Sequence, residues 1–153
     1  MDNKKIKNAK ETKFDGIKFK SNTEVTIYKT LLQYGFEPKY EPTKYIIWEG
    51  CKPTVPYYKP SKQGNLEINN TKLINTTYTP DFVFLAPDNE TFIIIEVKGH
   101  ENDTYPIKEK MFRKTLENLN INEGIKTMFF KIKTKKQCLE AIEIINNTFK
   151  NEE

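Results

Sequence analysis

The sequence predicts a mixed α/β fold, an α+β arrangement around a mixed sheet. Three segments carry helix start signals followed by apolar residues at helical spacing. Four other segments are short apolar runs rich in β-branched and aromatic residues. In chain order they read as helix, three strands, helix, strand and helix. Because helix and strand signals alternate, we expect helices packed on a sheet.

Length and composition predict one globular domain. The chain has 153 residues, of which 37% are hydrophobic and 12% aromatic, enough for a core of its own. Residues 1–13 are polar and rich in lysine, and we expect a flexible basic arm there. A single domain over 14–153 follows. The arm has two interpretations, a solvated tail or a segment that contacts a phosphate backbone.

The net charge and the cysteine content indicate which partners and which compartment suit the protein. The net charge of +4 is compatible with a nucleic-acid partner without requiring one. Cys51 and Cys138 fall outside any metal-binding spacing, so we expect free thiols in a reducing compartment. The sequence contains no signal-peptide pattern and no long apolar run. We therefore expect a soluble cytoplasmic protein with no membrane partner.

The first predicted helix begins near Ser21. The run 21–24, Ser-Asn-Thr-Glu, has the pattern of a capping box, and apolar residues follow at helical spacing up to Gly35. Two roles are open for Glu24. It is the N3 residue of the capping box, or it is a carboxylate in the first helical turn that points at a catalytic site. A short extended segment over 14–19 precedes this helix.

A strand is predicted over 45–48, and a long polar segment over 49–77 follows it. The segment has several Pro and Gly residues and is long for a connection in a compact domain. Lys59 and Lys62 lie close to two tyrosines, a composition that suits contact with nucleic-acid backbones. An inserted hairpin or a dimer arm would have the same composition, so the three alternatives stay open.

The most informative pattern is a predicted hairpin over 78–99, with a tight turn over 86–90. If the turn centres on residues 88 and 89, Asp81 lies directly opposite Glu96. Lys98 is two residues beyond Glu96 and shares its face, because strand side chains alternate with a period of two. Ile93, Ile95 and Val97 then occupy the other face.

Opposed carboxylates at the end of an apolar hairpin predict a divalent cation. Like charges directly opposite each other destabilise a strand pair, and a cation removes the conflict. The carboxylates of Asp81 and Glu96, the backbone carbonyl of Val97 and water suit Mg²⁺, with Mn²⁺ as a substitute. Such an ion assists phosphodiester cleavage, and Lys98 would orient the nucleophile or neutralise charge. The alternative is a strand-capping Asp81 beside a Glu96–Lys98 ion pair.

A second helix is predicted to begin after Asp103 or Thr104, with Pro106 in its first turn. Its expected apolar face consists of Ile107, Met111, Phe112, Leu116 and Leu119, with Lys110, Arg113 and Lys114 on the opposite side. Lys108 falls among the apolar positions, and we expect it to point into the site rather than to snorkel.

The remaining segments complete the predicted fold. His100, the only histidine, is interpreted as a solvent-exposed loop residue outside the catalytic set. A last strand covers 125–132, and a second capping-box pattern at 134–137 opens a C-terminal helix.

These motifs resemble those of the PD-(D/E)xK nuclease superfamily, over roughly residues 14–132. Thr-Pro-Asp-Phe at 79–82 and Glu-Val-Lys-Gly at 96–99 match its motif. The chain is similar to the phage endonuclease I type of Holliday-junction resolvase, which combines a helix-borne Glu with both segments. It is also similar to a set of little-characterised phage and bacterial nuclease-like proteins, through residues 15–24 and 105–112.

The resemblance implies a restriction-endonuclease-like αβββαβ core with an additional C-terminal helix. It implies a Mg²⁺-dependent DNA endonuclease in which Glu24, Asp81 and Glu96 are metal ligands and Lys98 is the catalytic lysine. The expected nucleic-acid contacts are Lys59, Lys62, Lys108, Lys110 and Arg113.

The resemblance to resolvases implies branched or four-way-junction DNA as the substrate. A homodimer suits paired nicks in such DNA. Phage origin would place the protein in the host-cell cytoplasm. The basic C-terminal extension of endonuclease I has no counterpart here, and the segment 49–77 matches no landmark of the family. A restriction-like or repair nuclease and a catalytically silent DNA-binding scaffold are therefore the alternatives.

Overall fold

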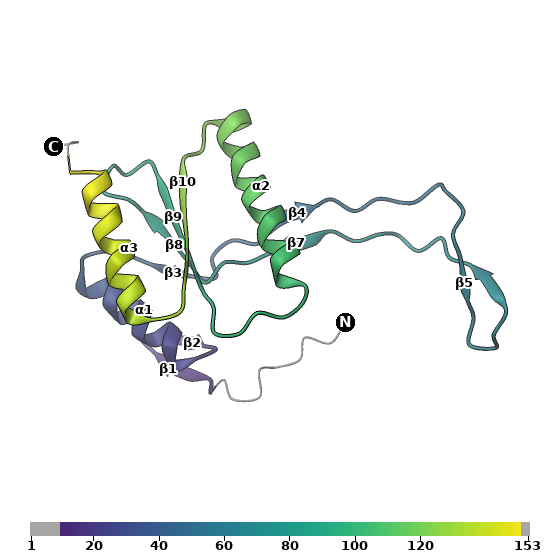
Figure 1. Ribbon diagram of the computed structural model, residues 1–153, viewed down its shortest axis with the longest axis horizontal. Helices are drawn as coiled ribbons and strands as arrows, with labels where there is room; N and C mark the ends of the chain where they lie inside the picture. Colours follow the sequence, from purple (N-terminus) through teal and green to yellow (C-terminus); the bar gives the residue numbers. More distant parts are fainter. Residues whose placement is uncertain (1–9, 151–153) are drawn as a thin grey trace.

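The structure is a computed structural model that describes residues 10–150. Figure 1 shows a body of helices around a sheet, with a long arm on one side. The elements in chain order are β1 (Thr12–Phe14), β2 (Ile17–Phe19), α1 (Asn22–Gln33), β3 (Lys39–Tyr40), β4 (Tyr45–Trp48), β5 (Tyr58–Pro60), β6 (Leu66–Ile68), β7 (Thr76–Tyr78), β8 (Phe82–Leu85), β9 (Phe92–Val97), α2 (Tyr105–Glu123), β10 (Thr127–Ile132) and α3 (Lys135–Thr148).

A four-stranded sheet in the order β10-β9-β8-β3 forms the centre of the body. β9 and β10 are parallel, whereas β8 runs antiparallel to both of its neighbours. Ile93 and Ile95 of β9 belong to the core that α1 and α3 share, whereas Ile94 packs with Phe112 and Leu116 of α2. The helices therefore cover both faces of a mixed sheet, which confirms the predicted fold class.

The register of the β8–β9 hairpin agrees with the prediction. Phe82 pairs with Ile95 and Val83 with Ile94, so the next position outward sets Asp81 opposite Glu96. The carboxylate of Asp88 accepts hydrogen bonds from the backbone N–H groups of Glu90 and Thr91, at 3.0 and 2.9 Å. This side chain closes the turn and thereby sets the register of both strands.

Local signals at both ends of α1 act as predicted. The Ser21 hydroxyl caps the helix by accepting a hydrogen bond from the Glu24 N–H. Gly35 has a φ of +86° and donates its N–H to the carbonyl of Leu32, while the Phe36 N–H reaches Leu31. This pair of bonds is a Schellman motif, which needs a residue in the left-handed conformation, and glycine adopts it without a steric penalty.

The N-terminal segment folds differently from the prediction. The stretch over 14–19 was expected to be one extended segment, but Asp15 and Gly16 both have positive φ and join β1 to β2 in a two-residue hairpin. An Asp-Gly pair favours this turn. Of the predicted basic arm over 1–13, residues 1–9 lie outside the described residues, whereas Thr12 and Lys13 belong to β1.

The strand over 45–48 forms as predicted, but it does not join the central sheet. β4 pairs with β7, and the short strand β3 takes the place beside β8. Glu41 follows β3 with a φ of +47°, and Pro42 comes next. A left-handed residue followed by proline turns the chain, so β4 begins in a new direction.

The long segment between β4 and β7 is a protruding β-arm, defined here as residues 49–75 (Figure 1). The Leu73 N–H donates to the Cys51 carbonyl at 2.9 Å, and the Asn69 N–H donates to the Tyr57 carbonyl at 2.8 Å. β5 and β6 form a two-stranded hairpin at its far end. Of the alternatives for this segment, the inserted hairpin is confirmed as a structure.

The helix α2 begins at Tyr105, one residue after the predicted cap. Thr104 occupies the N-cap position without a side-chain cap, and Asn102 accepts the Tyr105 N–H at 2.9 Å instead.

Among the helices of residues 10–150, none has the length and apolar character needed to cross a membrane.

Candidate active site

An open cleft of about 440 Å³ lies where β8 begins and β9 ends, beside the first turn of α1. We call it the acidic cleft. Its charged lining residues are Lys20, Glu24, Glu41, Asp81, Glu96, Lys98 and Lys133, and the exposed His100 also lines it. A larger groove of about 680 Å³ at the other end of the sheet has only Glu37 and Lys39 as charged lining residues. The groups capable of acid–base or metal chemistry thus gather in the acidic cleft.

All four predicted catalytic residues line the acidic cleft, together with Val97. Asp81 is held against the end of β9, because its Oδ2 accepts the Val97 N–H at 2.7 Å. The residue is only 7% exposed. Burial raises the pKa of Asp81 to about 8, and the negative charges of Glu96 and Glu24 act in the same direction. Burial therefore favours the protonated form of this carboxyl.

Glu96 has one oxygen that is engaged and one that is not. Its Oε1 lies 3.4 Å from the ammonium of Lys98. Its Oε2 is the one buried side-chain N or O atom of residues 10–150 that forms no hydrogen bond of normal geometry, although the Tyr78 hydroxyl is near enough to help lower the pKa of Glu96. Burial raises the pKa of Glu96, and the charge of Lys98 opposes the rise. A buried carboxylate oxygen without a partner is costly, so this atom marks a place for a further ligand.

The backbone of Glu24 belongs to the helix cap, and its carboxylate lines the acidic cleft. Its N–H is the group that the Ser21 cap accepts, which is the helix-capping role. Its carboxylate lines the cleft and accepts hydrogen bonds from the Lys20 N–H at 2.9 Å and from the Tyr40 hydroxyl at 2.8 Å. The carboxylate therefore reaches one residue beyond the N-cap, instead of closing the expected capping box on Ser21.

Glu41 and Lys20 form a rim that the sequence did not suggest. The Glu41 N–H donates to the Asp81 carbonyl at 2.8 Å, and its carboxylate forms an ion pair with Lys20. The backbone of Glu41 is in the left-handed conformation, and backbone strain of this kind is common at functional sites. A glutamate gives no sequence indication of that conformation.

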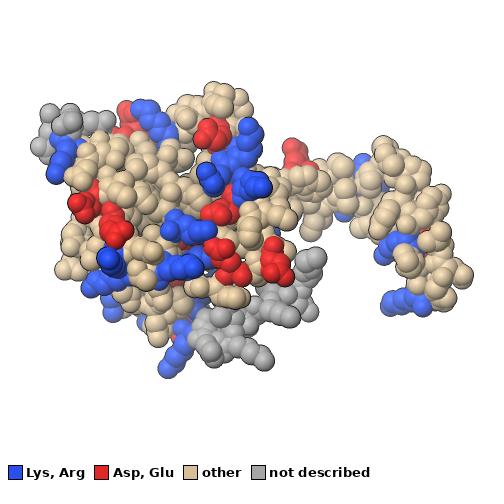
Figure 2. All heavy atoms as spheres, viewed as in Figure 1, with Lys and Arg blue, Asp and Glu red and all other residues tan. Residues whose placement is uncertain are grey.

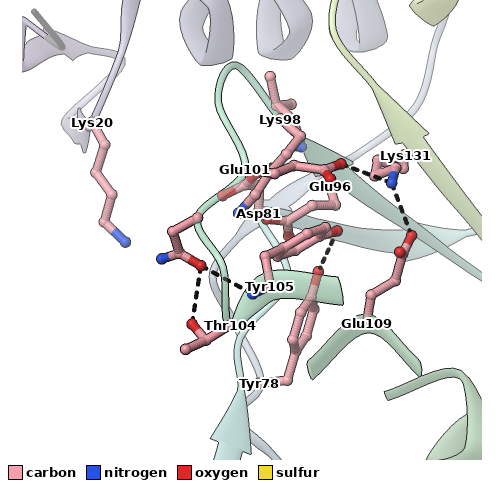
Figure 3. A network of polar contacts seen from close by, with 12 residues as sticks. Lys20, Tyr78, Asp81, Glu96, Lys98, Glu101, Thr104, Tyr105, Glu109 and Lys131 are labelled. Carbon is pink, nitrogen blue, oxygen red and sulfur yellow. Dashed lines mark hydrogen bonds and ion pairs between the residues drawn. The ribbon is translucent and has the colours of Figure 1, made fainter. Parts of the chain in front are cut away.

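Three further residues near the acidic cleft were missed: Tyr78, Tyr105 and Lys131 (Figure 3). The hydroxyl groups of Tyr78 and Tyr105 lie 3.3 Å apart, and burial raises the pKa of both. Lys131 is in register with Glu96 on the neighbouring strand, but its ammonium pairs with Glu101 and Glu109. The parallel pairing of β9 with β10 creates this neighbourhood, and no local sequence pattern encodes that pairing.

The prediction that Lys108 points into the site is wrong, since it is exposed and does not line the acidic cleft. The inward face of α2 is formed by Tyr105, Phe112 and Leu116, not by Ile107, which is 64% exposed. Successive helical residues are separated by roughly 100°, so Lys108 falls at the edge of this face. Of the expected apolar face, Phe112 and Leu116 are buried and Leu119 packs against the same core, so the prediction fails at Ile107 and Lys108.

The other expected nucleic-acid contacts lie away from the acidic cleft. Lys110 and Arg113 are exposed on α2, whereas Lys59 and Lys62 belong to the β-arm. Figure 2 shows basic side chains over α2 and at the far end of the β-arm, with acidic side chains between α2 and the lower part of the body. Lys59 lies 4.0 Å from Glu67 on the neighbouring strand.

The donor groups of the acidic cleft fit a hard divalent cation in part. Two buried carboxylates, one of them with an unpartnered oxygen, and the carbonyl of Val97 are the oxygen donors that Mg²⁺ prefers. Within residues 10–150, however, no three His, Cys, Asp or Glu side chains are grouped so that they could hold a metal ion. The set of three carboxylate ligands with Glu24 stays a prediction.

Comparison with known proteins identifies a family. The family model described as "Protein of unknown function (DUF1064)" matches residues 4–132. No curated protein and no solved structure matches the chain. The matched segment includes the β-arm and every charged residue of the acidic cleft except Lys133. Since the match covers most of the sequence, the chain belongs to the DUF1064 family of proteins of unknown function.

Proposed function

We propose that this protein is a Mg²⁺-dependent DNA endonuclease that hydrolyses phosphodiester bonds in branched DNA, such as a four-way junction. The observation that carries the proposal is the buried pair of Asp81 and Glu96, facing each other with Lys98 beside them. Two carboxylates with raised pKa values in a cleft mark a functional-site candidate. The protein would act in the cytoplasm. If a phage encodes it, this would be the cytoplasm of the host cell.

Asp81, Glu96 and the carbonyl oxygen of Val97 would hold Mg²⁺, with Mn²⁺ as a substitute. Glu24, in the first turn of α1, would be the third carboxylate ligand. The bound ion would supply Lewis-acid stabilisation of the developing negative charge and a more acidic water. Because burial favours the protonated form of Asp81, a metal ion would compete with a proton for this carboxylate.

Lys98 contributes a positive charge at the same place. Its ammonium lies beside the Glu96 carboxylate and lines the acidic cleft. A cation there can hydrogen-bond the attacking water or the charged phosphate oxygens in the transition state. Lys20 and Lys133 also line the cleft and would attract the phosphates that flank the scissile bond.

Two other assignments use the same observations. A restriction-like or repair nuclease would use the four catalytic residues on linear or damaged DNA. A catalytically silent scaffold would bind DNA through the lysines and leave the carboxylates idle. Retaining two buried, opposed carboxyl groups without a ligand would cost such a scaffold stability, which favours the enzyme.

The test is cleavage of matched synthetic substrates: a four-way junction, a flap and a linear duplex of the same sequence. Each is incubated with Mg²⁺, with Mn²⁺ or with EDTA, using wild type and Glu96→Gln. Glu143→Gln, an exposed change on α3, is the matched control for loss of one negative charge. We expect metal-dependent paired nicks near the branch point that Glu96→Gln abolishes and Glu143→Gln retains.

The other outcomes assign the alternatives. Equal cutting of the linear duplex would identify a nuclease without branch selectivity. DNA binding without cleavage in either metal, unchanged in Glu96→Gln, would overturn the enzyme proposal in favour of the scaffold.

We also propose that the protein acts as a homodimer assembled through the β-arm. Cross-strand partners lie on the same face of a hairpin, so Tyr58, Pro60, Leu66 and Ile68 share one face of β5–β6. All four are exposed, and Leu66 is 73% exposed. The opposite face carries the pair Lys59 and Glu67. A second copy would cover this apolar face with an identical one, which is the arrangement of a symmetric dimer.

A further inference from the structure

The position of the Lys98 ammonium depends on an aromatic ring. Lysine side chains are long and flexible, so a lysine at the end of a strand needs an anchor to stay in one place. The Lys98 Nζ lies 3.9 Å from the ring centroid of Tyr105 and 3.4 Å from Glu96 Oε1. An ammonium at this distance over a ring face is attracted by the negative charge of the π-system. Tyr105 and Glu96 thus hold the ammonium from two directions.

Tyr105 is itself held rigidly, as a positioning residue must be. It is 4% exposed and is the first residue of α2, where its N–H donates to Asn102 Oδ1 at 2.9 Å. Its hydroxyl lies 3.3 Å from the hydroxyl of Tyr78. Figure 3 shows the ring between Tyr78 on one side and Lys98 on the other. The start of a helix and a buried contact therefore fix the ring's orientation.

A competing cation is kept away from Glu96. Lys131 is in register with Glu96 on β10, and its Nζ lies 5.4 Å from the Tyr105 ring centroid. Its ammonium is bound instead by Glu101 at 2.9 Å and by Glu109 at 3.2 Å. These two carboxylates neutralise Lys131, which leaves Lys98 as the cation that pairs with Glu96.

We propose that Tyr105 is the positioning residue for Lys98: the face of its ring, not its hydroxyl, holds the ammonium at the Glu96 edge of the acidic cleft. The catalytic consequence rests on the proposed nuclease function. The position of Lys98 is a property of the folded chain alone, so the two claims can fail separately.

The first experiment measures the position without any substrate. Protons above an aromatic ring shift upfield, so the ε-methylene signal of Lys98 should lie upfield of the signals of exposed lysines such as Lys108, as should the signal of Lys29, whose ammonium lies over the Phe14 ring. The signal is assigned in ¹³C-lysine-labelled protein by its loss in Lys98→Arg. We expect Tyr105→Phe to keep the shift and Tyr105→Leu to abolish it. A wild-type Lys98 signal without an upfield shift would overturn the proposal, even if Tyr105→Leu fails to fold.

The second experiment measures catalysis. In Tyr105→Leu we expect kcat to fall by roughly two- to thirtyfold, the range that corresponds to one cation–π contact, with KM for DNA unchanged. Tyr105→Phe should restore most of the activity, whereas a purely structural role of the hydroxyl would leave both variants equally impaired. That equality would overturn the proposal. If wild type does not cleave DNA, the proposed function fails while the NMR result still decides the role of Tyr105.

Discussion

Asp81 and Glu96 are held in direct opposition by strands that are otherwise apolar, and this conflict is the main feature at the scale of single residues. Each of the two residues is 7% exposed. The pKa values of both are raised, because burial disfavours the charged form. Replacing a charged group of this kind with a neutral one of the same shape often stabilises a protein. The loss of stability caused by two opposed, buried carboxyl groups is expected at a ligand-binding site and not in a structural ion pair.

Removing the Asp81 charge should stabilise the protein at alkaline pH. The pKa of Asp81 is about 8 in the folded state against an ordinary 3.8, so folding retains a proton that the unfolded chain releases. The stability is therefore complete below about pH 4, falls as pH rises towards about pH 8, and is level above it. Asp81→Asn keeps the acceptor for the Val97 N–H and does not titrate.

We expect the free energy of unfolding of Asp81→Asn to exceed that of wild type by up to about 6 kcal/mol at about pH 9, the linkage value for a pKa raised from 3.8 to about 8, and to match it at about pH 4. Urea unfolding at acid, neutral and alkaline pH measures this difference. A wild-type stability that follows the mutant in parallel at all three pH values would contradict the raised pKa.

Divalent cations should stabilise the fold through the same residues. A ligand that binds only the folded state raises the unfolding temperature. Millimolar Mg²⁺ should raise that of wild type by about 2–6 °C, which corresponds to about 1–2 kcal/mol. Glu96→Gln should show no rise, whereas Glu143→Gln should behave as wild type. Calorimetry with NaCl at equal ionic strength separates binding from screening, and an equal rise in Glu96→Gln would show that the ion binds elsewhere.

At the scale of elements, the β-arm depends on one close approach between the two backbone segments that form its base. The Gly50 N–H donates to Asn75 Oδ1 at 2.8 Å. A Cβ added at Gly50 would lie 1.9 Å from the carbonyl oxygen of Leu73, which is a backbone atom and cannot move alone. Glycine is needed here for the approach of two backbones, because any side chain would separate them.

Gly50→Ala should therefore open the base of the β-arm and leave the body intact. The Leu73 N–H, which donates to the Cys51 carbonyl, should exchange with deuterium faster in the variant. The amides of β9 should keep their protection, since the arm does not support the central sheet. Gln63→Ala, an exposed change in the arm's turn, is the control. Equal exchange of Leu73 in Gly50→Ala and wild type would contradict this account.

At the scale of the whole molecule, the β-arm of a single copy exposes an apolar face to solvent. Two-stranded hairpins are marginally stable alone in water, and among the strands of residues 10–150 β5 and β6 pair only with each other. Burying the face formed by Tyr58, Pro60, Leu66 and Ile68 against a second copy would stabilise the hairpin and the dimer together.

Sedimentation should therefore find a dimer that Leu66→Asp weakens. Losing one buried apolar side chain costs about 1.5–3 kcal/mol, so we expect a dissociation constant raised by roughly tenfold or more. Gln63→Asp adds the same charge in the turn, off the apolar face, and should leave the dimer unchanged. A wild-type monomer across the accessible concentrations would rule out the homodimer, and equal dimers in both variants would place the interface elsewhere.

Short-range patterns predicted much of the structure. The caps at Ser21 and Thr134, the stop at Gly35 and the β8–β9 register are all present as expected. Each is decided by neighbours within a few residues, through side-chain capping, a left-handed glycine or a tight turn. The Asp-Gly turn at 15–16 carried an equally clear signal that was overlooked.

Local sequence determined the helix ends, the hairpin register and the pairing of Asp81 with Glu96, because each depends on contacts between residues close in the chain. Only the tertiary structure decided which strand lies beside β8, that Lys108 stays outside the acidic cleft, and that the Tyr105 ring lies against the Lys98 ammonium. These outcomes depend on packing between segments far apart in sequence, such as β9 against β10. Lys108 and Lys131 show the difference: the helical pattern indicated the first wrongly, while strand pairing sets the second in register with Glu96, with its ammonium bound by Glu101 and Glu109.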